Sequence, residues 1–177
     1  MAGTMDGDEL RRFMAHWATG VTVVTVGDGP RDFGLTVNAF LSVSLHPPTV
    51  LVSLTQDADS TPVLERVGAF AVNLLAFDQR SLSERFAAAV PPEEKFRGLP
   101  LRRGVTGAPL LHGTLGALEA RVERPFDVAD HRLFLGKVVA LHSGRDVEPL
   151  LYFRRRYSES AGAGSLTLPP SAPPANR

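Results

Sequence analysis

The segments Val21-Thr22-Val23-Val24-Thr25-Val26 and Gly34-Leu35-Thr36-Val37-Asn38-Ala39-Phe40 decide the fold expected for this chain. The first segment is a β-branched run, which is typical of a strand. Between the two segments lies Gly27-Asp28-Gly29-Pro30, a cluster of turn-forming residues. We therefore expect a strand, a turn, and a second strand that leads into a loop near Asn38.

Further strands are expected along the rest of the chain, with few helices between them. About seven strands and two or three helices in this order favour a barrel or sandwich over a parallel α/β sheet. The pattern alone allows an α+β fold or an all-β barrel. The domain is expected over 6–157, with a surface loop over 91–109 and a disordered tail over 158–177. The other expected strands cover 49–54, 70–75, 116–123, 133–141 and 150–153, and the later helices begin near Ser60 or Thr61 and cover about 78–88.

The first helix has a clear start and one apolar face. Asp6 is expected to cap it, with Glu9 at capping-box spacing, and Gly20 to follow its end. Apolar residues at helical spacing are usually core residues, so we expect this face to pack inside the molecule. The face consists of Leu10, Phe13, Met14 and Trp17.

Composition excludes several classes of function. The chain has 177 residues, 44% of them hydrophobic, and 19 basic residues balance 19 acidic ones. There is no cysteine, no apolar run near the roughly 18 residues of a membrane helix, and no targeting segment. The five histidines show no ligand spacing, and no nucleotide-binding glycine loop or hydrolase elbow is present. We expect a cytoplasmic protein without a metal, a membrane or a nucleic-acid partner.

Hydroxyl and amide side chains gather where the expected strands end. Phosphate groups bind to hydroxyl donors and to the backbone N–H groups of a helix N-terminus. Ser60 and Thr61 open a short helix and offer both, while Asn38 offers polar atoms for the polar edge of a ligand ring. A structural explanation fits the same residues, because threonine favours strands and Ser60 or Thr61 can simply cap a helix.

A second candidate is the pair Asp130-His131, which precedes the segment Leu133–Val138. A histidine that opens a strand after a turn can form a hydrogen bond with a ligand at the mouth of a barrel. It can equally be a polar turn residue. The residues alone leave both interpretations open.

Taken together, these motifs resemble the flavin reductase-like, FMN-binding split-barrel family, from about Glu9 to Tyr157. This family includes the reductase components of two-component flavin monooxygenases. Mild departures are Phe33 before Gly34, Ala88 after Phe86-Ala87, and Ala129 where a glycine commonly precedes the Asp-His pair. The matching segments are Ala18–Thr25, Gly34–Phe40, Ser42–Leu45, Phe70–Leu75, Arg85–Ala87, Lys95-Phe96, Asp130–Val138 and Leu150–Tyr152 with Arg156-Tyr157.

The resemblance implies a mainly β, six- or seven-stranded antiparallel split barrel that forms a homodimer. It implies an NAD(P)H-dependent flavin reductase that reduces FMN, or FAD, and supplies reduced flavin to a monooxygenase. An FMN-bound oxidoreductase for an organic substrate and a non-catalytic flavin-binding module are the alternatives. The resemblance places the flavin ring and ribityl chain against Thr36, Val37, Asn38 and Ala39, with Ser53 and Leu54 flanking them. It places the phosphate on Ser60 and Thr61, and Phe86 and Ala87 along the groove. It places His131 where the nicotinamide and flavin rings meet.

Overall fold

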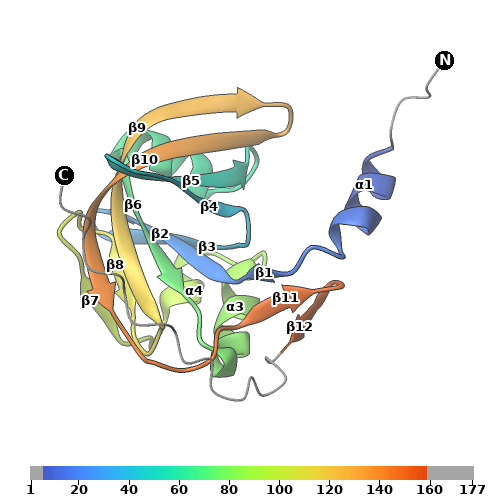
Figure 1. Ribbon diagram of the computed structural model, residues 1–177. Helices are drawn as coiled ribbons and strands as arrows, with labels where there is room; N and C mark the ends of the chain where they lie inside the picture. Colours follow the sequence, from blue (N-terminus) through green and yellow to red (C-terminus); the bar gives the residue numbers. More distant parts are fainter. Residues whose placement is uncertain (1–5, 159–177) are drawn as a thin grey trace, which may run out of the picture.

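A seven-stranded antiparallel sheet forms the centre of the computed structural model, which describes residues 6–158 (Figure 1). Its strand order is β3-β2-β6-β9-β10-β5-β4. The expected mainly β, antiparallel barrel is therefore confirmed. The strands are β2 (Thr22–Asp28), β3 (Arg31–Val37), β4 (Phe40–Leu45), β5 (Pro48–Thr55), β6 (Ala69–Leu74), β9 (Gly116–Val128) and β10 (His131–Ser143).

The two edge strands of this sheet are neighbours in the sequence. Only Asn38 and Ala39 separate the end of β3 from the start of β4. Three Cα–Cα steps span at most about 11 Å, so the sheet has to curl until its edges nearly meet. The edges do not pair with each other, and this gap between β3 and β4 is called the split below. The sequence did not predict β4 as a strand.

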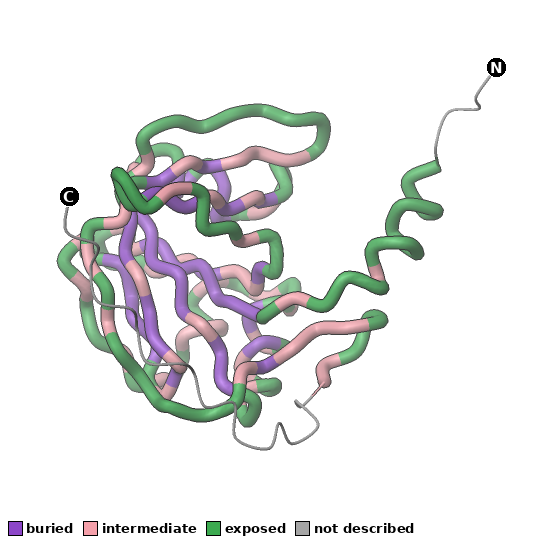
Figure 2. The backbone as a smooth tube through the Cα atoms, viewed as in Figure 1, coloured by how far each residue is buried: buried purple, intermediate pink, exposed green. Residues whose placement is uncertain are grey.

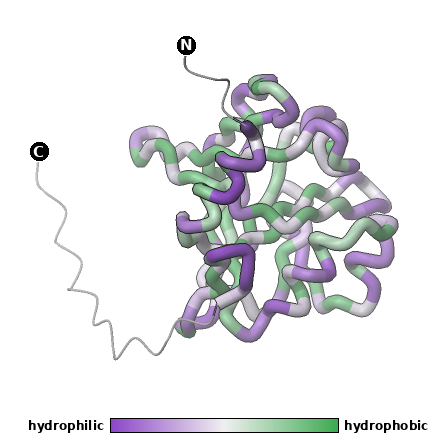
Figure 3. Tube along the Cα trace, turned by 90° about the vertical axis from the view of Figure 1, so that its right-hand side faces the viewer, coloured by the Kyte–Doolittle hydropathy of each residue, from purple (hydrophilic) through white to green (hydrophobic). Residues whose placement is uncertain are grey.

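The inside of the curled sheet holds the main core (Figure 2). Phe70 and Phe134 are fully buried there together with valines of β2 and β5. The Phe70 ring lies close to the backbone of β10 at Gly136. Glycine is needed there, because a Cβ at this position would lie 2.8 Å from the ring. Hydrophilic segments gather at the turns along the periphery (Figure 3).

Three helices flank the barrel, and the sequence did not predict the third. α2 (Ser60–Val67) buries Val63 and Leu64 against the main core. α3 (Arg80–Ala87), preceded by the single turn η1 (Phe77–Gln79), buries Phe86 in a second cluster, and α4 (Pro92–Phe96) adds Phe96 to it. Every helix within residues 6–158 is too short or too polar to cross a lipid bilayer.

Two small sheets complete the described structure. β1 (Thr19–Gly20) pairs with β11 (Leu151–Phe153), which pairs with β12 (Arg156–Ser158). β7 (Leu101–Arg103) pairs with β8 (Pro109–Leu111). The expected surface loop over 91–109 was wrong, because Leu99 and Leu101 pack on the second cluster. Ser158 belongs to β12, and the rest of the expected tail, 159–177, lies outside the described residues.

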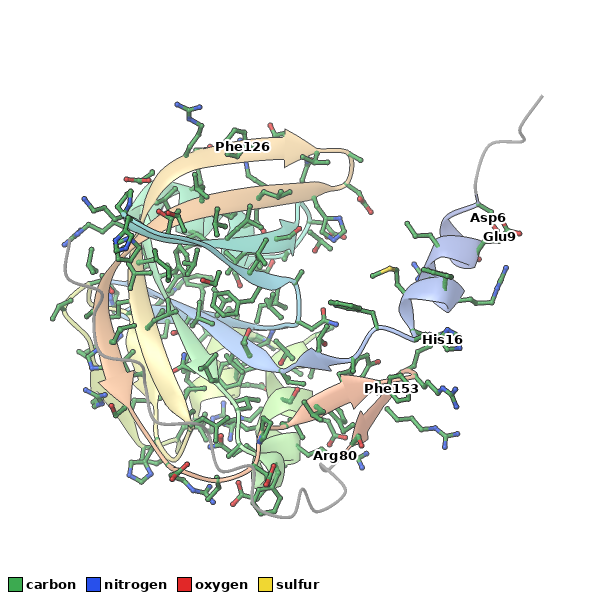
Figure 4. The ribbon with its side chains drawn as sticks, viewed as in Figure 1. Asp6, Glu9, His16, Arg80, Phe126 and Phe153 are labelled. Carbon is green, nitrogen blue, oxygen red and sulfur yellow. The ribbon has the colours of Figure 1, made fainter. Side chains whose placement is uncertain are left out.

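The expectation that the first helix packs in the core was also wrong. α1 (Gly7–Met14) extends away from the barrel and has no buried residue (Figures 1 and 2). Phe13 is 75% exposed and Trp17 68%. Asp6 does cap the helix, by accepting a hydrogen bond from the Asp8 amide, and it lies with Glu9 at the far end of α1 (Figure 4). The spacing of apolar residues predicted an apolar helix face, but it did not identify the surface that packs against this face.

Glu119 on β9 joins the β7–β8 loop to the sheet from a fully buried position. Its carboxylate accepts hydrogen bonds from the amides of Val105 (2.9 Å) and Thr106 (2.6 Å), from the Thr106 hydroxyl (2.6 Å), and from His142 Nε2 (2.7 Å). Burial raises the pKa of the Glu119 carboxyl, but the hydrogen bonds from Thr106, His142 and Val105 outweigh burial and hold that pKa below its usual value. The charged form is therefore the stable one in the fold.

Glu119→Gln should destabilise the protein by about 3 kcal/mol, because it leaves buried donors without a charged acceptor. Urea unfolding measures this loss, and Glu123→Gln, exposed on the same strand, should change stability by less than about 0.5 kcal/mol. Because the pKa of the Glu119 carboxyl is lowered in the folded state, its contribution to the free energy of unfolding is fully present above about pH 4.3. That contribution is lost as pH falls through the folded-state pKa. Equal stability of wild type and Glu119→Gln at neutral pH would contradict this role.

Candidate functional site

The link between β3 and β4 is the accessible part of the split. Asn38 and Ala39 are both exposed, whereas Val37 just before them is buried. The Ser53 amide donates a hydrogen bond to the Ala39 carbonyl over 3.0 Å, which fixes the link against β5. The structure thus brings Ala39 and half-buried Ser53 together, and the buried Leu54 next to Ser53 supports them from the core.

Thr36 connects this link to α3. Its hydroxyl donates to the carbonyl of Ser83 over 2.6 Å. Ser83 Oγ in turn shares a hydrogen bond of 3.0 Å with the hydroxyl of Tyr157 on β12. Arg80, labelled in Figure 4, lies 5.4 Å from the centre of the Tyr157 ring. The hydroxyl of Thr36 is therefore used inside the fold, and its role at the split is to hold β3 against α3.

The C-terminal end of α3 supplies the other wall. Phe86 is fully buried, and its ring meets Phe96 edge-on at 5.0 Å. A Cβ on Gly34 would lie 2.5 Å from this ring, so the glycine of the β3 motif makes room for it. Ala87, by contrast, is exposed. Of this expected pair, Ala87 can touch a ligand, whereas Phe86 supports the wall from behind.

Ser60 and Thr61 are the first two residues of α2, and neither is its N-cap. Asp59 holds that position and makes no capping hydrogen bond with its side chain, so the expected capping role was wrong. The Thr61 hydroxyl donates to the Thr55 carbonyl over 2.7 Å, which ties α2 to the end of β5. The Thr61 amide donates to the Ala58 carbonyl over 2.9 Å, and Pro62 has no N–H group. Ser60 and Thr61 are both buried, so the first turn of α2 leaves few N–H groups for an anion.

His131 opens β10, as expected, and lies opposite Thr55 of β5. Its Nδ1 is 2.8 Å from Asp130 Oδ1. The hydrogen bond from His131 lowers the pKa of the Asp130 carboxyl. An ionised carboxylate only accepts hydrogen bonds, so Nδ1 is the donor and Nε2 is the ring atom left for a ligand.

Gln56 holds the turn that presents His131, and the sequence did not indicate this role. Its amide donates to the Asp130 carbonyl over 2.9 Å, and its side-chain Nε2 donates to the Ala129 carbonyl over 3.1 Å. No periodicity or motif marks such a residue, because its partners are backbone atoms 73 or more positions away.

A second hollow, of about 380 Å³, lies beside β7 and β8. Two of its polar side chains are already engaged within the fold. His142 is bonded to Glu119, and Arg145 forms an ion pair with Asp78 at 2.9 Å. Because the expected site residues converge instead on the split, we assign the site to the split.

Comparison with known proteins shows the family of the chain. The family model for the flavin reductase like domain matches residues 14–161. The chain belongs to the flavin reductase-like family. The reductase subunit HsaB of a flavin-dependent monooxygenase from Rhodococcus jostii is 34% identical over 157 residues, which cover 89% of this chain and 80% of that protein. The FMN reductase (NADH) RutF of Ancylobacter novellus is 36% identical over 162 residues, 91% of this chain and 89% of that protein.

Solved structures show the same fold. The NADH:FAD oxidoreductase SgcE6 of Streptomyces globisporus C-1027, determined in complex with NAD and FAD fragments, is 34% identical to this flavin reductase-like chain. It superposes with a TM-score of 0.84 and covers 93% of this chain and 100% of that one. The resemblance identified from the sequence motifs is confirmed.

The structure also shows the consequence of one departure from the family pattern. Ala129, where a glycine is common, has a φ of 53°. This left-handed conformation costs an L-residue with a Cβ roughly 1–2 kcal/mol. The turn before His131 therefore carries local strain, which the hydrogen bonds from Gln56 help to hold.

Ala129→Gly should relieve this strain and raise the free energy of unfolding by up to about 1 kcal/mol. Ala140→Gly, on the same strand pair beside a register shift but outside the left-handed region, should instead lower it by roughly 0.5–1 kcal/mol. Thermal and urea unfolding of the two variants give the comparison. A loss of stability in Ala129→Gly would show that the turn is not strained in this way.

Proposed function

We propose that this protein is an NAD(P)H:flavin oxidoreductase that reduces FMN or FAD and supplies the reduced flavin to a partner monooxygenase. The observation that carries the proposal is the convergence of the Asn38-Ala39 link, the start of α2 and His131 on one split of a flavin reductase-like barrel. Relatives with 34% and 36% identity are a monooxygenase reductase subunit and an NADH-dependent FMN reductase.

The residues at the split suit a flavin. Asn38 is exposed and offers amide donors and an acceptor for the polar edge of the ring. Ala39 and Ala87 are small and exposed, so a flat ring can approach the backbone at both. We assign the flavin phosphate to the start of α2, where Ser60 and Thr61 lie beside the end of β5. Val37, Leu54 and Phe86 are buried and keep these surfaces in place.

The redox chemistry would come from a flavin held at the split, which can accept a hydride from a nicotinamide and a proton from solvent. The chain itself has to bind both rings and orient them. We assign His131 to this orientation. With Nδ1 held by Asp130, its Nε2 can accept a hydrogen bond from the carboxamide N–H group of a nicotinamide. The proposal requires no general base.

The direct test is multiple turnover of NADH or NADPH with excess FMN, followed at the nicotinamide absorbance band. Wild type should turn over. His131→Ala should leave flavin affinity nearly intact, raise the KM for the nicotinamide substrate and slow reduction by roughly 10- to 100-fold. His131→Asn should recover part of this loss, because it keeps a polar group at that position.

Two results would contradict these assignments. A protein that binds flavin tightly but does not turn over would instead be an FMN-bound oxidoreductase for an organic substrate or a flavin-binding module. Wild-type rates and KM in His131→Ala would reduce His131 to a solvent-facing turn residue.

We further propose a homodimer, in the cytoplasm where NAD(P)H is available. The support is exposed apolar side chains in two places. Phe13 lies on α1 and Trp17 just after it, and Leu45 on β4 is 73% exposed. Exposed apolar patches of this kind usually mark an interface. A second copy of the same chain is the partner that the family resemblance implies.

Light scattering at micromolar concentration should therefore report a dimer, with an interface of roughly 2,000 Å² or more in total. Phe13→Glu should shift the equilibrium toward monomer, because it places a charge in that interface. Arg12→Glu changes the charge at an exposed neighbour on α1 and tests whether charge alone has this effect. A monomeric wild type would refute the homodimer.

A further inference from the structure

The second hollow, beside β7 and β8, has the size and the walls of a small-molecule site. Its volume is about 380 Å³, whereas an enclosed apolar cavity of roughly 150 Å³ is already enough to bind benzene. None of its lining residues is one that we assign to the split, and β7 and β8 lie on the side of the barrel away from α1 (Figure 1). Its apolar lining includes Leu101, Leu110, Leu111 and Ala117.

His142 of β10 lines this hollow and is oriented by the buried Glu119. Its Nε2 lies 2.7 Å from a carboxylate oxygen of Glu119. Burial raises the pKa of the Glu119 carboxyl, but its hydrogen bonds lower that pKa further. The carboxylate is therefore ionised and can only accept hydrogen bonds. Nε2 is thus the donor in this contact, and Nδ1 is the ring atom left for a ligand.

Nδ1 of His142 is open to such a ligand. Within residues 6–158 it has no hydrogen-bond partner, and it is not sealed from solvent. A carboxylate bonded to one ring nitrogen fixes the orientation of a histidine and makes the other nitrogen a better acceptor. A single oriented polar atom among apolar walls is the usual composition of a small-molecule site.

The charges around the hollow favour a neutral hydroxyl group over an anion. A carboxylate at Nδ1 would lie close to the ionised Glu119, in surroundings that screen the repulsion weakly. Arg145 offers little compensation, because it is paired with Asp78. A hydroxyl group donates to a neutral imidazole and accepts from a charged one, so it suits Nδ1 in either protonation state.

The apolar walls further favour an aromatic alcohol over an aliphatic one. A phenolic hydroxyl, with a pKa of about 10 in tyrosine, is a stronger hydrogen-bond donor than an aliphatic hydroxyl. A rigid ring loses little conformational freedom on binding, and leucine side chains remove its faces from water. A phenol therefore matches both the walls of the hollow and its oriented acceptor.

We propose that this hollow binds a small phenol, with the ring against Leu101 and Leu111 and the hydroxyl group hydrogen-bonded to Nδ1 of His142. The site goes beyond the proposed reductase function, since it shares no residue with the split and takes no part in hydride transfer. Glu119 is a positioning residue in it, because Glu119 acts only through His142. His112 lies exposed at the same hollow and is not required.

The experiment titrates the full chain with phenol, benzene, cyclohexanol and benzoate and follows the backbone amide NMR signals. Phenol should cause saturable shifts over 110–117 and 142–145, with a dissociation constant in roughly the millimolar range. Benzene lacks the hydroxyl group and cyclohexanol is the weaker donor, so both should bind roughly three- to tenfold more weakly. Benzoate should bind more weakly than phenol, because it brings a second negative charge near Glu119.

Two variants separate the two histidines of the hollow. His142→Gln keeps an N–H donor for Glu119 and removes the imidazole Nδ1, whereas His112→Gln makes the same change at the exposed neighbour. His142→Gln should reduce phenol affinity to about that of benzene and change benzene affinity by less than about twofold. His112→Gln should change neither. Urea unfolding checks that both variants fold, and the four ligands on wild type decide the matter if His142→Gln does not.

Four results would overturn the proposal. Absence of saturable shifts at the hollow, or shifts over 36–39 and 129–132 instead, would show that phenol does not bind there. Equal affinity for phenol and benzene would leave an apolar hollow in which His142 has no role. Benzoate as the tightest ligand would make the hollow an anion site beside the exposed Arg102. Loss of phenol binding in His112→Gln alone would assign the contact to the other histidine. Turnover of NADH with FMN is measured separately, so each of these results leaves the reductase function standing.

Discussion

The two-residue link between β3 and β4 is the constraint on which the rest of the structure depends. The strands that it joins stand at opposite edges of a seven-stranded sheet. A link of Asn38 and Ala39 can join them only if the sheet curls into a barrel whose edges nearly meet. The curl encloses the core of Phe70, Phe134 and the β2 and β5 valines. It also leaves the link itself exposed at the opening, where a ligand can reach polar backbone.

Hydrogen bonds and strand register hold several other parts of the site around this opening. Ser53 is bonded to Ala39, and Thr61 is bonded to the carbonyl of Thr55. Thr55 lies opposite His131 in the ladder between β5 and β10. The position of His131 relative to the split is therefore fixed by strand register, and side chains such as Gln56 refine it. A ring-binding site built on rigid strands suits a reaction in which orientation matters more than proton transfer.

Much of this was predictable from the sequence, for physical reasons. The β-branched run of β2 and the Asp130-His131 turn carry local signals, so their strands and the family resemblance followed from them. The strand β4 was not predicted, because its apolar residues Leu41, Val43 and Leu45 are exposed. The serines between them were interpreted as candidate ligand-binding residues instead. The position of α1 depends on which surface packs against its apolar face, and the spacing of apolar residues in one chain does not identify that surface.

Other features depend on contacts between distant segments. Glu119, Gln56 and Lys95 act through backbone carbonyls and amides that no local pattern marks. The resemblance drew attention to the Lys95-Phe96 pair, but its position between Gly34 and Phe86 emerges only in three dimensions. Likewise, the burial of Val37, Leu54 and Phe86 separates residues that support the site from Asn38, Ala39, Ala87 and His131, which can touch a ligand.

The central claim is that flavin binds at the split, and amide hydrogen exchange with and without saturating FMN tests it most directly. Binding should slow exchange at the link over 36–39, at the start of α2 over 59–63, around 86–88 and in the turn over 129–132. Exchange around the second hollow, over 110–117 and 142–145, should be unchanged. Protection confined to that second hollow, with none at the split, would contradict the account.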